Sequence, residues 1–98
     1  MTDKQFYVYI LASERNGTLY VGVSSELVGR SAKHKGEVTG GFTKKYGVKM
    51  LVYYEVYSDA ENAIKREKRL KKWPRTYKMK VIEEMNPEWK DLYETITA

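Results

Sequence analysis

Alternating apolar and polar positions predict three β-strands. Residues Phe6–Ala12 and Thr18–Val23 are rich in β-branched and aromatic side chains, and Asn16 and Gly17 between them are a strong turn signal. The two segments are therefore expected to pair as an antiparallel hairpin. A third strand is expected over Met50–Tyr57, which reads MLVYYEVY.

A helix is expected directly after the hairpin. Ser24 or Ser25 supplies an N-cap, and the helix continues to about Lys35. Gly36 ends it, and the glycine-rich residues 37–47 are expected to form a loop.

Three further helices are expected in the second half of the chain. Ser58–Glu61 has the sequence of a capping box, which opens a helix running to about Lys72. Pro74 permits the next helix to begin almost at once, because proline fits the first helical turn. Asn86–Pro87 breaks the chain again before a short terminal helix through Trp89–Leu92.

This order of elements, without a repeat or a linker, predicts one domain of the α+β class. A chain of 98 residues, 42% of them hydrophobic, suits a small three-stranded antiparallel sheet flanked by helices. The domain is expected to span residues 1–98, with a core over about 6–73 and a helical extension over 74–98. No apolar run reaches the ~20 residues of a membrane span, and no signal-peptide pattern is visible, so a cytoplasmic location is expected.

The cysteine and histidine content narrows the chemistry. The chain has no cysteine, which excludes a disulfide framework, a thiolate zinc site and a thiol nucleophile. His34 is the single histidine, so multi-histidine metal sites and most histidine-based triads are disfavoured.

The formal net charge of +5 is unevenly distributed. Half of the 18 basic residues fall in one short segment, which contains Glu67 as its single acid. These basic residues are Lys65, Arg66, Lys68, Arg69, Lys71, Lys72, Arg75, Lys78 and Lys80. Such a segment suits a polyanion, because each neutralised phosphate releases condensed counterions. A solvated helix face explains the same charges equally well.

The tyrosines of the predicted hairpin gather on one face, because side chains alternate across a strand. Tyr9, Tyr20 and Gly22 share this face, opposite an aliphatic face that includes Val8 and Val21. Gly22 has no side chain and leaves room for a substrate or a closely packed helix. Ordinary aromatic packing between neighbouring strands is the alternative.

Charged residues on the predicted helices are further candidates. Arg30 and His34 share a side of the first helix with Leu27, at helical spacing. On the second helix Glu67 interrupts an apolar stripe, which comprises Ala60, Ala63, Ile64 and Leu70. A carboxylate in that position loses hydration and needs a partner. An ion pair with a basic neighbour is one option, and a Mg²⁺ ion, which often takes only one or two carboxylates, is the other.

Together these residues resemble the GIY-YIG nuclease domain. Tyr7–Tyr9 and, after ten intervening residues, Tyr20–Gly22 are similar to its two namesake motifs, and Arg30, His34 and Glu67 follow in the family's order. The likeness extends over most of the chain and is closest to the small stand-alone bacterial GIY-YIG proteins.

The resemblance implies a role for each of these residues. Tyr9 or Tyr20 would deprotonate the attacking water, with Tyr9 favoured as the base and Tyr20 supporting it. Arg30 would hold the scissile phosphate, and His34 would hydrogen-bond near the tyrosine or the phosphate. Glu67 would anchor a single Mg²⁺ or Mn²⁺ ion.

Substrate contacts follow from the same resemblance. Gly22 would let the phosphate approach the backbone closely. The flanking strands would be held by a basic set on the second helix, namely Lys65, Lys68, Arg69, Lys71 and Lys72.

The function implied is that of a metal-dependent endonuclease that hydrolyses phosphodiester bonds in nucleic acid, with DNA as the expected substrate and repair or recombination as the expected setting. The alternative is a non-catalytic nucleic-acid-binding module that keeps the fold and the basic surface. Many family nucleases carry an additional DNA-binding domain for which this chain has no room. A protein partner or self-association is therefore expected to supply substrate specificity.

Overall fold

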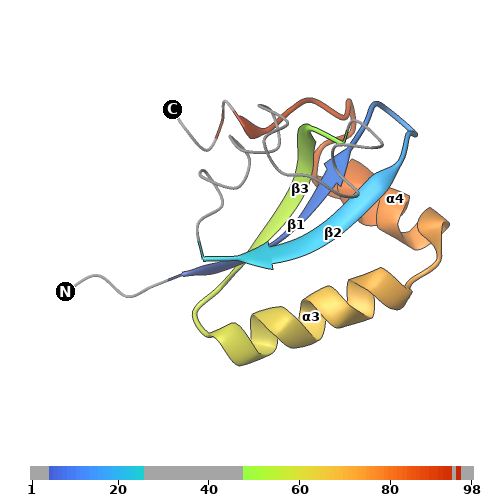
Figure 1. The fold of residues 1–98 in the computed structure, drawn as a ribbon. Helices are drawn as coiled ribbons and strands as arrows, with labels where there is room; N and C mark the ends of the chain where they lie inside the picture. Colours follow the sequence, from blue (N-terminus) through green and yellow to red (C-terminus); the bar gives the residue numbers. More distant parts are fainter. Residues whose placement is uncertain (1–4, 26–47, 94, 96–98) are drawn as a thin grey trace.

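A three-stranded antiparallel sheet forms the centre of the structure, a computed structural model that describes residues 5–25, 48–93 and 95 (Figure 1). The elements, labelled as in Figure 1, are β1 (Phe6–Ala12), β2 (Leu19–Ser24), β3 (Met50–Tyr57), α3 (Ala60–Lys72) and α4 (Arg75–Met85). The strands lie in the order β2-β1-β3. The predicted α+β class and the three-stranded antiparallel sheet are confirmed.

The turn between β1 and β2 is closed by its own hydrogen bonds. The Ser13 amide donates to the Thr18 carbonyl over 3.0 Å, and the Thr18 amide donates to Ser13 Oγ over 2.9 Å. Asn16 has a φ of 61°, a left-handed conformation that asparagine tolerates better than most residues. The turn predicted at Asn16 and Gly17 is confirmed.

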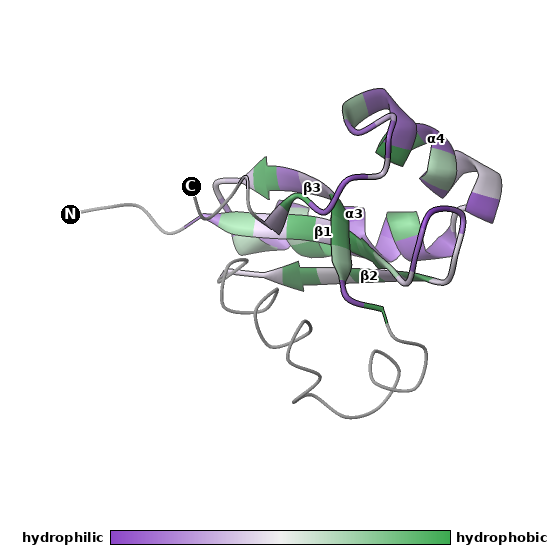
Figure 2. Cartoon of the chain, turned by 90° about the horizontal axis from the view of Figure 1, so that it is seen from above, coloured by the Kyte–Doolittle hydropathy of each residue, from purple (hydrophilic) through white to green (hydrophobic). Residues whose placement is uncertain are grey.

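The sheet buries side chains on both of its faces. Val8 and Ile10 of β1 belong to the larger core cluster, on the face covered by α3, whereas Tyr9 and Leu11 belong to a second cluster. Figure 2 shows hydrophobic residues along the strands. The predicted alternation is confirmed, and both faces are packed.

The pairing of β1 with β3 contains a bulge that the sequence did not reveal. The register shifts between Ile10 and Leu11, and Val52 is the extra residue of β3. The side chain of Asn86, 5% exposed, donates from Nδ2 to the Val52 carbonyl over 3.2 Å and to the Lys90 carbonyl over 2.7 Å. Asn86 thus ties the bulge to the C-terminal segment.

Helix α3 begins with a different cap from the predicted one. Asp59 is the N-cap, and its Oδ2 accepts a hydrogen bond from the Asn62 amide over 2.9 Å. The capping box predicted at Ser58–Glu61 is therefore wrong. Aspartate accepts this bond at least as well as serine, so the helix starts one residue later.

Fewer residues of α3 are buried than its predicted apolar stripe contains. Ala63 and Leu70 are fully buried in the larger core cluster, whereas Ile64 is 42% exposed. Ile64 follows Ala63 by one residue, which turns it about 100° round the helix and away from the sheet. Its assignment to the apolar stripe is wrong.

Helix α4 follows Pro74, as predicted, and buries Ile82 against the same cluster. The short terminal helix predicted through Trp89–Leu92 is wrong for those residues: none of them is helical, and the first helical residue after Met85 is Tyr93. Trp89 has a φ of 57° and closes a turn, its amide donating to the Asn86 carbonyl over 3.0 Å. Its indole is instead buried in the core, so the C-terminal extension contributes directly to the fold.

The residues after this turn lie against β3. The Leu92 amide donates to the Leu51 carbonyl over 2.7 Å, and the Leu51 amide donates to Asp91 Oδ1 over 3.1 Å. These contacts satisfy backbone groups on the outer side of β3, which a sheet edge otherwise leaves open.

The body of the helix predicted from Ser24 or Ser25 to Lys35, and the loop predicted over 37–47, lie outside the described residues.

Neither α3 nor α4 nor any other helix in the described part of the chain is long and apolar enough to cross a membrane.

We expect Asn86→Ala to lower the free energy of unfolding by about 2 kcal/mol, because it leaves the carbonyls of Val52 and Lys90 without a donor in a buried setting. Urea denaturation monitored by circular dichroism measures the change. Asn62→Ala is the control, because Asn62 is exposed and its loss should cost well under half as much. Equal losses in the two variants would contradict the structural role of Asn86.

Candidate functional site

Tyr9 and Gly22 face each other across β1 and β2. A Cβ atom placed on Gly22 would lie 2.6 Å from both Cζ and Oη of Tyr9, so the tyrosine ring crosses directly over the glycine. Tyr9 is only 2% exposed. The space that Gly22 leaves is therefore filled by the Tyr9 ring, whose hydroxyl reaches over β2.

Tyr20 lies on the same side of the hairpin, opposite Leu11 in the register. It is partly buried and packs against the cluster that contains Tyr9. Because Tyr20 precedes Gly22 by two residues, it is the diagonal neighbour of Tyr9, at a typical Cα separation of about 7–8 Å. The prediction that the hairpin brings both tyrosines to a common surface is confirmed.

Glu67 is a nearly buried carboxylate in the middle of α3. Its side chain is 12% exposed, and its Oε2 lies 2.7 Å from Nζ of Lys71, one turn further along the helix. This is the ion pair that the sequence left as an alternative to a metal ion. The Lys71 side chain is 53% exposed, whereas the carboxylate is nearly buried, so a cation that displaces Lys71 has to take its place as the partner of Glu67.

Glu67 and Tyr9 lie on opposite sides of the sheet. Helix α3 packs with Ala63 and Leu70 in the cluster of Val8, whereas Tyr9 belongs to the other cluster. A site that both residues share therefore has to extend around an edge of the sheet, and β2 is one of its two edge strands. Arg30 and His34, the remaining predicted members, lie outside the described residues.

At this site the described residues offer a metal ion one carboxylate, that of Glu67. Within residues 5–25, 48–93 and 95, no three histidine, cysteine, aspartate or glutamate side chains gather as a ligand group. A lone, shielded carboxylate is a poor donor set for zinc. It suits Mg²⁺ or Mn²⁺, which keep several waters and accept few protein oxygens.

The predicted substrate-binding cations of α3 divide into paired and unpaired residues. Lys65 lies 3.3 Å from Glu61, and Lys71 is held by Glu67. The other three are exposed and form no ion pair within the described part of the chain: Lys68, Arg69 and Lys72.

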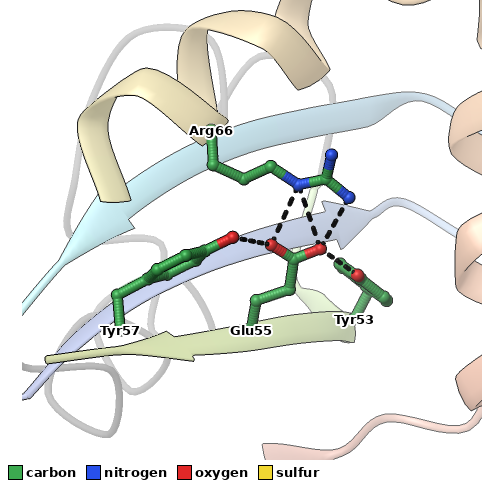
Figure 3. A network of polar contacts seen from close by, with 4 residues as sticks. All are labelled: Tyr53, Glu55, Tyr57 and Arg66. Atoms are coloured by element: carbon green, nitrogen blue, oxygen red, sulfur yellow. Dashed lines mark hydrogen bonds and ion pairs between the residues drawn. The ribbon is translucent and has the colours of Figure 1, made fainter. Parts of the chain in front are cut away.

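A polar network that sequence reasoning missed joins β3 to α3 (Figure 3). Arg66 Nε donates to Glu55 Oε1 over 3.0 Å, and Arg66 Nη2 donates to Glu55 Oε2 over 2.9 Å. The hydroxyls of Tyr53 and Tyr57 donate to the same carboxylate, the latter over 2.7 Å. The guanidinium also lies 4.8 Å from the ring centroid of Trp73. The sequence does contain a signal for this network. Tyr53, Glu55 and Tyr57 are alternate residues of the segment YYEVY, so their side chains share one face of β3.

This network fixes the protonation of its members. Burial and the hydrogen bond to Glu55 raise the pKa of Tyr53 beyond its ordinary range and raise that of Tyr57. Burial by itself would raise the pKa of the Glu55 carboxyl, but the hydrogen bonds from Arg66 and the tyrosines outweigh it and lower that pKa. Tyr53 and Tyr57 therefore stay protonated near neutral pH and are not candidates for the base. The network instead stabilises the contact between α3 and β3.

Comparison with known proteins places this geometry in a family. The family model described as the GIY-YIG catalytic domain matches residues 5–81. A UPF0213 protein of Staphylococcus haemolyticus is 36% identical over 78 residues, which cover 80% of this chain and 94% of the relative. A UPF0213 protein of Staphylococcus epidermidis is 37% identical over 82 residues, which cover 84% of this chain and 98% of the relative.

A solved structure has the same fold. The solution NMR structure of a UPF0213 protein from Bacillus halodurans superposes with a TM-score of 0.55 at 24% identity, and the match covers 89% of this chain and 92% of that one.

We expect Gly22→Ala to lower the free energy of unfolding by about 1–3 kcal/mol, because the new methyl group meets the buried Tyr9 ring. A double-mutant cycle with Tyr9→Leu, measured by urea denaturation, isolates the contact. The loss should be clearly smaller in the Tyr9→Leu background. An equal loss in both backgrounds would contradict the packing of Tyr9 over Gly22.

We expect Glu55→Gln to lower the free energy of unfolding near pH 7 by about 2 kcal/mol, because charge-assisted hydrogen bonds to Arg66 are lost. The lowered pKa of Glu55 stabilises the fold above the ordinary glutamate value of 4.5, and this stabilisation is lost as the pH falls through the lowered value. The gap between wild type and variant should therefore close in acid.

Urea denaturation across this pH range measures the gap. Glu61→Gln is the matched control, since Glu61 pairs with Lys65 at an exposed position and should change little at any pH. A gap that stays constant below pH 4.5 would show that Glu55 contributes no ionised carboxylate.

Proposed function

Because the chain belongs to the GIY-YIG nuclease family, we propose that it is a metal-dependent endonuclease that hydrolyses phosphodiester bonds in DNA. The observation that carries the proposal is the hairpin, which sets Tyr9 over Gly22 and brings Tyr20 to the same face. Glu67 on α3 supplies a shielded carboxylate that an exposed lysine neutralises.

In this proposal Glu67 holds a single Mg²⁺ or Mn²⁺ ion in place of the Lys71 ammonium. When bound, the ion supplies positive charge to the phosphate, which gains negative charge in the transition state. Lys71 then remains close by as a second cation. The ion pair supports the proposal because it places a cation 2.7 Å from this carboxylate.

The proposed base is Tyr9, with Tyr20 in support. Water attacks phosphorus as its proton passes to the tyrosine oxygen, and the bond from phosphorus to the leaving oxygen breaks. An ordinary tyrosine pKa of about 10 makes the phenol a weak base at neutral pH, so a nearby cation has to favour the phenolate. Arg30 is proposed for that task and for holding the phosphate, and His34 for a hydrogen bond to the tyrosine or the phosphate.

The Tyr9 ring fills the space beside Gly22, so the role proposed for Gly22 is to let the Tyr9 hydroxyl reach over β2 toward the phosphate. The flanking DNA is proposed to lie along α3, on the basic set Lys65, Lys68, Arg69, Lys71 and Lys72. We further propose that residues 1–98 act as one cytoplasmic domain in DNA repair or recombination. A partner protein or a second copy would then supply substrate specificity.

A non-catalytic nucleic-acid-binding module is the second candidate. Two observations favour it: Tyr9 is nearly buried, and Lys71 already satisfies Glu67. Such a module would use the exposed cations of α3 and need neither a metal ion nor a base.

We expect Glu67→Gln to reduce metal-dependent cleavage by roughly a hundredfold or more, because the carboxylate that holds the cation is lost. The assay uses end-labelled single-stranded, flap, branched and duplex DNAs with Mg²⁺, Mn²⁺ or EDTA. Glu61→Gln is the matched control on the exposed side of the same helix and should cleave like wild type. Comparable cleavage by wild type and Glu67→Gln would contradict the proposed role.

Tyr9→Phe and Tyr20→Phe separate the two tyrosines in the same assay. The proposal expects the larger loss in Tyr9→Phe, since the base is removed. A loss confined to Tyr20→Phe would transfer the role of base to Tyr20. Binding without cleavage in wild type, unchanged by Glu67→Gln, would favour the binding module.

A further inference from the structure

Cations gather where the end of α3, the start of α4 and the β1–β2 turn meet. We call this group the basic corner, and it comprises Lys71, Lys72, Arg75 and Lys78. Lys71 is paired with Glu67, whereas the other three form no ion pair with a carboxylate among the residues that the structure describes. A net positive charge therefore remains on this surface.

Hydrogen bonds hold the basic corner in place. Nη2 of Arg75 donates to the carbonyl of Asn16 over 2.6 Å and to that of Gly17. Nζ of Lys78 donates to the Lys71 carbonyl over 3.2 Å. Figure 1 shows the β1–β2 turn beside α4. Arg75 and Lys78 are thus held by backbone carbonyls, which carry no formal charge and leave both cations uncompensated.

Helix electrostatics explain only part of this arrangement. The carbonyl end of α3 attracts Lys71 and Lys72, as the C-terminus of a helix does for any cation. Arg75 opens α4, where the helix dipole disfavours a cation, and the first turn carries no acid. Burial and the charge of Arg75 both lower the pKa of Lys78, so the two cations repel each other. An anion placed between them would relieve this repulsion.

We propose that the basic corner binds a backbone phosphate of nucleic acid, next to the phosphate that is cut. The position follows from Lys71, which contacts Glu67 through its side chain and Lys78 through its carbonyl. Glu67 and Lys71 are four residues apart in the helix, about 6 Å along the axis. This inference rests on the proposed function, and it adds Arg75 and Lys78 to the residues that hold the substrate.

Salt-dependent binding tests the proposal without cleavage. Fluorescence anisotropy of a labelled DNA duplex in EDTA is measured from about 50 to about 200 mM KCl. For Lys72→Gln/Lys78→Gln, the slope of log K against log salt concentration should become shallower by about 1, the value of one phosphate contact. Lys80→Gln/Lys90→Gln removes the same charge outside the corner and should keep the wild-type slope. Circular dichroism confirms that both variants fold.

Lys78→Arg serves as the rescue variant, because it keeps the charge and should keep the slope. Equal slopes for the two double variants would overturn the proposal, and so would a wild-type protein that does not bind DNA. If wild type binds with the predicted slopes but cuts none of the DNAs, the corner is supported and the endonuclease is not. Cleavage that survives with unchanged slopes supports the endonuclease and overturns the corner.

Discussion

The antiparallel register of β1 and β2 is the constraint on which the candidate site depends. It sets Gly22, the glycine of these two strands, opposite Tyr9. The tyrosine ring can therefore pack directly over the β2 backbone. A shift of β2 by one residue would turn Tyr20 to the face that α3 covers and separate it from Tyr9, because side chains alternate along a strand. The turn at Asn16 fixes this register, and Arg75 holds the turn from α4.

A second link, between Glu55 and Arg66, sets the position of α3 on the sheet. Two tyrosine hydroxyls and the Trp73 ring complete the surroundings of this ion pair. Arg66 directly precedes Glu67 in α3. The contact that holds the helix on the sheet therefore also positions the proposed metal ligand. Arg66, which holds α3 on the sheet, and Glu67, the proposed metal ligand, are therefore neighbours in one helix, with opposite charges and different partners.

Much of the fold was predictable from local patterns. Alternation predicted three strands and their faces, and an asparagine followed by glycine predicted the turn. Two of the misses depend on contacts distant in sequence. The bulge at Val52 is held by Asn86, and the Trp89 side chain is buried in the core. The residues next to Asn86 and Trp89 in the sequence give no indication of these contacts.

The candidate site was predictable to a similar extent. Spacing placed Tyr9 and Tyr20 together and marked Glu67 as a carboxylate in need of a partner. It did not reveal that the ring of Tyr9 fills the space beside Gly22, or that Lys71 is the partner of Glu67. Both depend on side-chain conformations, which the order of residues does not specify.

The most direct test of the account is whether Glu67 binds a divalent ion beside the hairpin. A titration with Mn²⁺, followed by amide NMR spectra, reports proximity because the paramagnetic ion broadens nearby signals whether or not the protein cleaves DNA. The account predicts that the amides of Glu67, Lys71 and Gly22 broaden first in wild type and stay sharp in Glu67→Gln. Broadening that is the same in both proteins, or that centres on the acidic residues Glu83 and Glu84, would contradict it.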